Sequence, residues 1–383
     1  MGAQNRQNSQ PNSLAELAGL FLKLGIIGFG GPAAHIAMMQ DEVVVKRKWM
    51  SEQHFLDLIG ATNLIPGPNS TEMAIHIGHE RAGWKGLIVA GLCFILPAVI
   101  ITGFFAWLYK GYGQLPQLQP FLYGIKPAII AIILGAIYPL ARKSLKSVQL
   151  WVIGGLTLLL SLLGYNEIWL LFGSGFLAIL LSNIRFPGNT RVSGFIFPFL
   201  TIAPDPKLIS VSNLKFFLVF LKIGAILYGS GYVLFAFLDT ELVSTGMLSR
   251  QQLIDAIAVG QFTPGPVFSS VTFVGYQIRG VWGAVYSTVA IFLPSFLFVA
   301  LLNPLVRKAR NSQLFSTFLD AVNVASVAII IAICYDMGIA VVVDRKSILI
   351  MTVAIVLTFG FRKINSVFII LGGAIFGYWL TLL

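Results

Sequence analysis

Apolar stretches long enough to cross a bilayer follow one another along the chain, separated by short polar segments. A helix needs about 20 mostly apolar residues to span the hydrocarbon core. Six such stretches lie in the first half, near 14–37, 55–77, 86–109, 121–140, 148–164 and 167–184. Six more lie in the second half, near 214–238, 252–275, 282–303, 314–335, 347–361 and 364–382. The pattern predicts an all-α polytopic membrane protein.

The two halves repeat each other at an offset of 197 to 199 residues. Phe21-Leu22-Lys23-Leu24-Gly25 returns as Phe220-Leu221-Lys222-Ile223-Gly224, and Pro66-Gly67-Pro68 returns as Pro264-Gly265-Pro266. Internal repeats of this kind are typical of secondary transporters. We therefore divide the chain into a polar N-terminal tail (1–13), a first transmembrane repeat (14–190), an inter-repeat linker (191–213) and a second transmembrane repeat (214–383).

The second apolar stretch of each half carries Pro-Gly-Pro at its middle, which a continuous helix cannot pass. It either crosses as a broken helix or enters and returns as a hairpin. With both stretches re-entrant, 17 of the 26 Lys and Arg residues lie inside, 6 outside and 3 in the membrane. If both stretches cross, the better orientation places 13 inside and 10 outside, so the positive-inside rule favours the hairpins.

The re-entrant arrangement leaves five spanning helices in each half, and an odd number inverts the second repeat relative to the first. The predicted fold is therefore two inverted-topology repeats, each with about five spanning helices plus a re-entrant Pro-Gly-Pro hairpin. The two Pro-Gly-Pro tips are expected to meet near the middle of the bilayer, where substrate sites of inverted-repeat transporters lie.

Composition agrees with this class and excludes others. The chain is 57% hydrophobic and 11% charged, whereas soluble domains average about 25% charged. The net charge of +11 does not indicate nucleic acid, because the basic residues lie mostly in short loops, where they set orientation. The first 13 residues lack the apolar core of a signal peptide, so no cleavage is expected.

The two Pro-Gly-Pro tips are the strongest candidates for a substrate-binding site. Asn69 and Glu72 fit a capping box after the first tip, and the helix that starts there exposes unpaired N–H groups and a positive dipole end that suit an anion. A plain kink with a self-satisfied cap is the alternative, but two copies at one register favour a site. The residues predicted to bind the anion here are Gly67, Asn69, Ser70, Thr71, Gly265, Ser269 and Ser270.

Two intramembrane lysines, Lys23 and Lys222, occupy equivalent positions, and a lysine at this depth is functional by default unless it snorkels to the interface. Small residues follow seven and eight positions later, on or near the same helical face. The predicted substrate contacts in this region are Lys23, Gly30, Gly31, His35, Lys222, Gly229 and Ser230. Taken alone, His35 is better explained as a packing residue.

Glu72 and His76 are the candidates for proton coupling, since they lie one helical turn apart and can touch. A helix cap is an equal alternative for Glu72, and packing is the alternative for His76. The four histidines form no cluster with metal-ligand spacing, so no metal is expected. We find no nucleophile–base pair and no cofactor motif, so neither an enzyme nor a cofactor is predicted.

These motifs resemble the chromate transporter family. The resemblance rests on Phe29-Gly30-Gly31-Pro32, His35, Trp49, Pro66-Gly67-Pro68 and Leu96-Pro97 in the first half, and on Phe220-Leu221-Lys222, Pro264-Gly265-Pro266 and Leu293-Pro294 in the second. It covers nearly the whole chain past residue 14 and implies a long, two-domain member that exports chromate and handles isosteric sulfate. Two features depart from the family pattern. In the second half Gly231 stands at the place of Pro32 and no histidine follows it, and in the first half Glu72 stands where an amide or small residue is expected.

We therefore expect a multi-pass transporter of the cell inner (plasma) membrane that exports chromate or another divalent oxyanion. The membrane potential favours efflux of a dianion by about 2.3 kcal/mol per charge per 100 mV, with a coupling proton left open. The expected partners are the small oxyanion and the lipid bilayer, not nucleic acid, with a homodimer left open. An oxyanion-selective channel is the alternative, because it would share the hairpins and the anion site.

Overall fold

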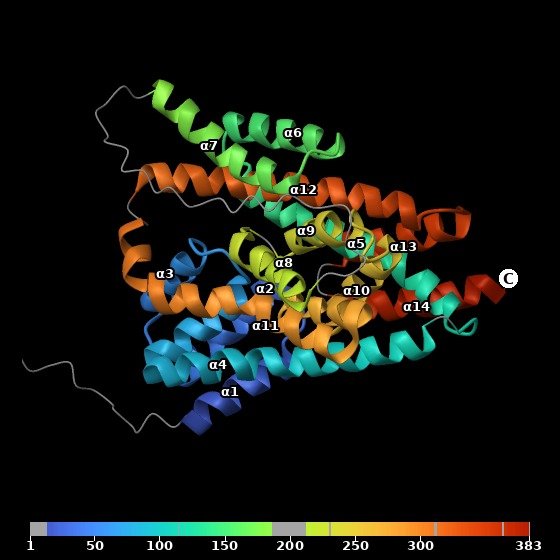
Figure 1. Ribbon diagram of the computed structural model, residues 1–383, viewed down its shortest axis with the longest axis horizontal. Helices are drawn as coiled ribbons and strands as arrows, with labels where there is room; N and C mark the ends of the chain where they lie inside the picture. The colour runs from blue at the N-terminus through green and yellow to red at the C-terminus, as the bar shows by residue number, and fades with distance from the viewer. Residues whose placement is uncertain are drawn as a thin grey trace, which may run out of the picture.

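The computed structural model describes residues 14–113, 115–185, 212–229, 231–309, 312–361 and 364–382, without the side chains of 183–185 and 302–309. Within these ranges the chain forms helices and connections and no strand (Figure 1). The tail, the linker up to residue 211 and Ser230 lie outside the described residues.

The helices of the first repeat are α1 Leu14–Ile27, α2 Gly31–Gln40, the π-helical turn η1 Asp41–Lys46, α3 Glu52–Thr62, α4 Asn69–Tyr112, α5 Gln119–Ser144, α6 Val148–Leu162 and α7 Glu167–Arg185. Those of the second repeat are α8 Asn213–Ile226, α9 Val233–Leu238, η2 Asp239–Val243, α10 Arg250–Phe262, η3 Val267–Ser269, α11 Ser270–Ala309, α12 Gln313–Val341, α13 Arg345–Gly360 and α14 Ser366–Leu382. The same order of elements recurs in both halves, including the π-helical turns, except that the short 3-10 helix η3 of the second half has no counterpart among the described residues of the first.

The first apolar stretch of each half is broken, and the prediction of one continuous helix there was wrong. α1 ends at Ile27 and α2 begins at Gly31, with Gly30 at φ +104° between them. Gly229, 199 residues later, has φ +92° after the end of α8. A positive φ suits glycine and stops a right-handed helix. Each repeat therefore contains two interrupted helices, the first at this glycine and the second at Pro-Gly-Pro.

The chain turns back on itself around the first Pro-Gly-Pro. His54, near the start of α3, lies 3.5 Å from Glu80, near the end of the first part of α4. Two residues later the helix breaks at Ala82 and Gly83. The reversal brings Gly78 against the backbone of Gly86, so that only hydrogen side chains fit between the two segments.

The second repeat makes the same reversal at Arg279 and Gly280, where Gly275 packs against the backbone of Gly283. Equivalent long helices of the two repeats run in opposite directions: α4 beyond its kink against α11 beyond its kink, and α5 against α12 (Figure 1). Opposite directions are what an inverted repeat requires.

The two repeats interlock instead of standing side by side. α5 of the first repeat packs against α13 and α14 of the second, and α12 of the second packs against α6 and α7 of the first. α4 and α11 also pack against each other. The interface between the repeats is therefore the centre of the molecule.

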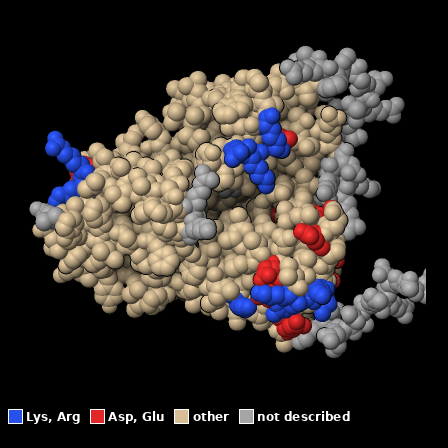
Figure 2. Space-filling model, turned by 180° about the vertical axis from the view of Figure 1, so that it is seen from behind, with Lys and Arg blue, Asp and Glu red and all other residues tan. Residues whose placement is uncertain are grey.

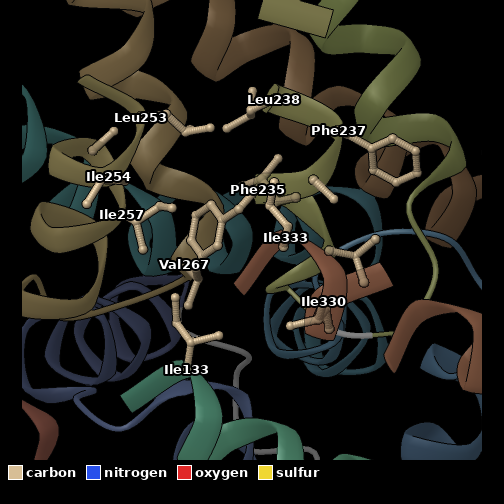
Figure 3. Close-up of a cluster of buried hydrophobic side chains, with 14 of the residues drawn as sticks. Ile133, Phe235, Phe237, Leu238, Leu253, Ile254, Ile257, Val267, Ile330 and Ile333 are labelled. Carbon is tan, nitrogen blue, oxygen red and sulfur yellow. The ribbon is translucent and has the colours of Figure 1, made fainter. Parts of the chain in front are cut away.

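The largest core cluster lies at this interface. Figure 3 shows Ile133 of α5 facing Val267 of the second tip, with Phe235 of α9, Ile257 of α10 and Ile333 of α12 around them. All five side chains are buried. Close packing fixes the second hairpin against helices of both repeats.

Four helical stretches among the described residues are long and apolar enough to cross a membrane: Asn69–Tyr112, Gln119–Ser144, Val267–Leu301 and Gln313–Val341. Shorter apolar helices accompany them at Val148–Leu162, Glu167–Ser182 and Ser366–Leu382. Charged side chains visible in Figure 2 gather toward the two ends of the molecule, over an uncharged surface between them. These features agree with a helical membrane protein, and the count of ten crossings stays a prediction.

Candidate functional site

Each Pro-Gly-Pro tip is hydrogen-bonded to the broken first helix of the opposite repeat. The N–H of Gly67 donates to the carbonyl of Leu227 at 2.8 Å, and the N–H of Gly265 donates to the carbonyl of Gly28 at 2.7 Å. Gly67 and Gly265 are repeat equivalents, as are Gly28 and Leu227. The two bonds are therefore one contact made twice by a pseudo-two-fold relation, and they place four helix breaks at one interface.

Only glycine fits the centre of each tip. Gly67 has φ +139° and Gly265 has φ +88°. A Cβ at Gly67 would lie 2.6 Å from Ser295 Oγ and closer still to the Glu72 carboxylate. A Cβ at Gly265 would lie 2.8 Å from the Cβ of Ala98, the repeat equivalent of Ser295. Each tip therefore packs onto the residue that follows the kink proline, Pro97 or Pro294, of the other repeat.

The first tip gathers polar side chains in a fully buried environment. Thr71, Glu72 and His76 have no exposed surface, and Ser295 faces them from α11. The Thr71 hydroxyl, both Glu72 oxygens and both His76 ring nitrogens lack a hydrogen-bonding partner of good geometry among the described residues. Buried polar groups are normally paired, so unpaired ones mark a place where a ligand, water or proton completes the structure.

The predicted capping box at Asn69 and Glu72 was wrong. The cap position of α4 is Pro68, which has no side-chain cap, and Asn69 is the first residue of the helix. Asn69 instead donates from Nδ2 to Asn63 Oδ1 at 2.9 Å. Pro68 supplies extended backbone geometry without a side-chain acceptor, so Glu72 has no capping partner and turns toward Gly67. The N–H groups of Thr71 and Glu72 both donate to the Pro68 carbonyl, so among the described residues the open N–H groups of this uncapped helix start are those of Asn69 and Ser70.

The second tip gathers hydroxyl groups and a fixed histidine. Ser269 and Ser270 are fully buried, and neither hydroxyl has a partner among the described residues. His35 Nε2 lies 2.9 Å from the Gly28 carbonyl, the same oxygen that accepts from Gly265. The His35 ring also contacts Phe94 edge to face. His35 is therefore part of the second tip, although it lies in the first repeat.

The break after α8 completes the first tip. Ser326 of α12 donates to the carbonyl of Tyr228 at 3.1 Å. A Cβ at Gly229 would lie 2.8 Å from Ser326 Oγ and 3.4 Å from Asn323 Oδ1. Gly31 has open space around it and φ +77°. The glycines predicted as substrate contacts thus shape the breaks, and Gly229 lets two polar side chains of α12 approach the backbone.

Lys23 and Lys222 are each paired with a glutamate 19 residues later. Lys23 Nζ lies 3.0 Å from Glu42, and Lys222 Nζ lies 2.5 Å from Glu241. Lys46 and Arg47 also bind Glu42. The hydrogen bond from Lys23, and to a smaller extent those from Arg47 and Lys46, lower the pKa of the Glu42 carboxyl to about 2. The two lysines anchor the π-helical turns, and the Lys23 side chain is 53% exposed. Their predicted contact with substrate stays a prediction.

A different lysine is buried between the repeats. Lys126 of α5 lies 3.3 Å from Asp255 of α10, and the Tyr109 hydroxyl donates to the other Asp255 oxygen at 2.6 Å. The two ion-pair side chains are 13% and 3% exposed. Asn323, beside Gly229, is the repeat equivalent of Lys126. By the same repeat relation, Lys126 is expected on the side of the second tip.

Sequence reasoning missed Ser295, Ser326 and the Lys126–Asp255 pair as parts of this interface. Ser295 follows Pro294 directly, so the kink proline was a signal for it. Lys126 and Asp255 stand out in the sequence as charged residues inside apolar stretches, but the repeat gave no sign that they pair with each other, because Asp255 corresponds to Asp57 and Lys126 to Asn323. Among the described residues, no group of three or more His, Cys, Asp or Glu side chains is arranged to hold a metal ion.

Comparisons with known proteins agree with the repeat. The family model described as Chromate transporter matches residues 15–179 and again 214–378. A probable chromate transport protein of Synechococcus elongatus is 32% identical over 348 residues, covering 88% of this chain and 86% of that protein. A chromate transport protein of Cupriavidus metallidurans is 29% identical over 374 residues, covering 95% of this chain and 92% of that protein.

An uncharacterized transporter of Methanocaldococcus jannaschii is 25% identical over 378 residues, covering 94% of this chain and 92% of that protein. No solved structure matches the chain. The family model covers most of both repeats. The chain therefore belongs to the chromate transporter family.

Proposed function

We propose that this protein is a secondary transporter that exports chromate across the cytoplasmic membrane and binds it between the two Pro-Gly-Pro tips. The observation that carries the proposal is the reciprocal pair of hydrogen bonds from Gly67 to Leu227 and from Gly265 to Gly28. It supports a shared substrate site, because it gathers the helix starts of both repeats at one buried interface. Relatives named as chromate transport proteins support the substrate.

In the membrane, both tips belong to re-entrant hairpins of two inverted repeats. The contact between His54 and Glu80 supports a hairpin that returns to its side of entry. The opposite directions of equivalent helices support the inversion (Figure 1). Irregular backbone survives at membrane depth only where protein or a wet cavity surrounds it, and the buried tips meet this condition.

The donors at the tips suit a compact dianion. Helix starts present N–H groups and a positive dipole end. The hydroxyl groups of Thr71, Ser269 and Ser270 have no hydrogen-bonding partner among the described residues, so they can donate to an anion. Such donors bind any tetrahedral oxyanion, so sulfate competes with chromate. Glu72 and His76 carry the coupling proton at the first tip, while the membrane potential drives the charge outward at about 2.3 kcal/mol per charge per 100 mV.

Transport by purified protein in proteoliposomes tests the function. We expect labelled chromate uptake that saturates, exchanges against unlabelled chromate or sulfate, and leaves chromate unreduced. Single-channel currents without counter-exchange would establish the channel instead. Loss of chromate as it is reduced would establish an enzyme.

Cysteine protection tests the site. In a variant lacking Cys93 and Cys334, single cysteines at Ser70 and Ser269 should react with a small thiol reagent during turnover, and saturating chromate or sulfate should slow both reactions. A cysteine at Ser161, outside the tips, serves as the control. Equal rates with and without anion, in variants that still transport, would place the substrate elsewhere.

A further inference from the structure

A pocket of about 480 Å³ opens between the C-terminal parts of α5 and α13, and none of its lining residues belongs to the tips. Its lining includes Gly135, Tyr138, Arg142, Lys143, Thr358 and Phe359. Figure 2 shows a hollow in the surface beside one group of Lys and Arg side chains. No step of the proposed transport uses this pocket.

The floor and one wall of the pocket are apolar and fixed by packing. Gly135 lets Thr358 approach the α5 backbone, because a Cβ there would collide with the Thr358 methyl group. Tyr138 and Phe359 pack edge to face with ring centroids 6.5 Å apart. The two rings are 51% and 40% exposed, so together they present an apolar surface to the surroundings of the helices.

The pocket also carries two cations without counter-charges. Arg142 and Lys143 are exposed and form no ion pair with an acidic side chain among the described residues. The next lysine along the chain, Lys146, is paired with Asp320 at 2.9 Å. The pocket therefore has a local excess of positive charge.

The pocket combines an apolar wall with two adjacent cations at the ends of two apolar helices. This combination suits the part of a phospholipid where the acyl chains meet the headgroup. Basic pockets between transmembrane helices on the cytoplasmic side bind anionic headgroups in this way. The positive-inside count assigns the end of α5 to the cytoplasmic side, where the leaflet is anionic. We propose that this pocket binds an anionic phospholipid, with Arg142 and Lys143 on its phosphate and Tyr138 and Phe359 against its upper acyl chain.

Lipid-dependent stability of the full-length protein tests the proposal. Thermal unfolding in neutral detergent is measured with added phosphatidylglycerol, phosphatidylcholine or inorganic phosphate. Phosphatidylglycerol should raise the unfolding temperature at lower concentration than phosphatidylcholine. The double variant Arg142→Gln/Lys143→Gln should need about 30-fold more phosphatidylglycerol for half of the effect, the loss of about 2 kcal/mol expected for two interfacial cations.

The matched control is Arg345→Gln/Lys346→Gln, which removes an adjacent Arg-Lys pair at the other end of α13. This variant should respond to phosphatidylglycerol as the parent does. An equal response from the Arg142/Lys143 variant, or equal effects of the two lipids on the parent, would overturn the proposal. Stabilisation by inorganic phosphate alone, lost in the same variant, would assign the pocket to free oxyanion instead. None of these outcomes depends on transport.

Discussion

The two Pro-Gly-Pro tips have the same backbone and different side chains. Each tip donates from its glycine N–H to the opposite broken helix and packs onto the residue after a kink proline. The first tip adds an acid and an imidazole, Glu72 and His76, where the second has a serine, Ser269 or Ser270, and an apolar residue, Phe273 or Val274, because the offset changes from 198 to 197 between Pro-Gly-Pro and Gly78. The two tips thus share the backbone geometry that we propose binds the anion, and the side chains proposed to carry a proton stand at one tip only.

The surroundings of the tips differ in the same way. The cation Lys126 in the first repeat corresponds to the amide Asn323 in the second. Lys126 is paired with Asp255 across the interface between repeats. Asn323 and Asp57, the repeat equivalents of this pair, cannot form an ion pair with each other, so the two sides of the interface differ in charge.

Replacing the tip glycines should have the largest effect and should not distinguish the tips. Gly67→Leu and Gly265→Leu should each abolish chromate transport, because a side chain collides with Ser295 or Ala98 and glycine's positive φ is lost. Gly155→Leu is the matched control, since nothing lies within 4 Å of its Cβ position. Transport and membrane expression are measured together. Activity in a well-expressed Gly265→Leu variant would show that only the first tip matters.

Breaking the buried ion pair should destabilise the protein. Lys126→Met leaves the Asp255 charge buried and unpaired, which typically costs about 3–5 kcal/mol. Thermal unfolding in detergent measures the loss, and Lys126→Met/Asp255→Leu should recover most of it. The exposed pair Lys146–Asp320 is the control, since Lys146→Met should cost about 0–1 kcal/mol. Similar losses in both single variants would contradict an asymmetric interface.

The two tips should separate when their unequal side chains are replaced. Glu72→Gln should make chromate transport independent of an imposed pH gradient while leaving chromate exchange intact, because the amide cannot carry the proton. Ser270→Ala should keep the pH response and weaken chromate binding, since a hydrogen bond to a charged group is worth about 1.5–3 kcal/mol. The measurement is initial transport rate against external pH and chromate concentration. A retained pH response in Glu72→Gln would assign the coupling elsewhere.

The smallest effect is expected at the two paired lysines. Lys23→Met and Lys222→Met should each weaken chromate binding by less than about tenfold, because Glu42 and Glu241 already neutralise their charge and the change acts at a distance through water-screened interactions. Transport measured over a range of chromate concentrations gives the apparent affinity. A loss as large as that of Ser270→Ala would make the lysines direct ligands.

Part of the fold followed from the pattern of the chain alone. The repeat, the helical class and the interruption at Pro-Gly-Pro all depend on local features: apolar length, register and proline geometry. The break at Gly30 and Gly229 was missed although the sequence carries a signal for it, because Gly30-Gly31-Pro32 and Gly229-Ser230-Gly231 are clusters of helix-breaking residues. The capping box was also misjudged, since Pro68 and not Asn69 occupies the cap position.

By itself, the sequence determined the class, the two repeats and the chemical types at the two tips, because these depend on composition and on spacing along one chain. Only the tertiary structure decided which groups meet. It bonds each tip to the other repeat's broken helix, brings Ser295 beside Glu72 and pairs Lys126 with Asp255. These contacts join residues 129 to 237 positions apart, and they follow from how α4, α5, α10 and α11 pack, which no local pattern encodes.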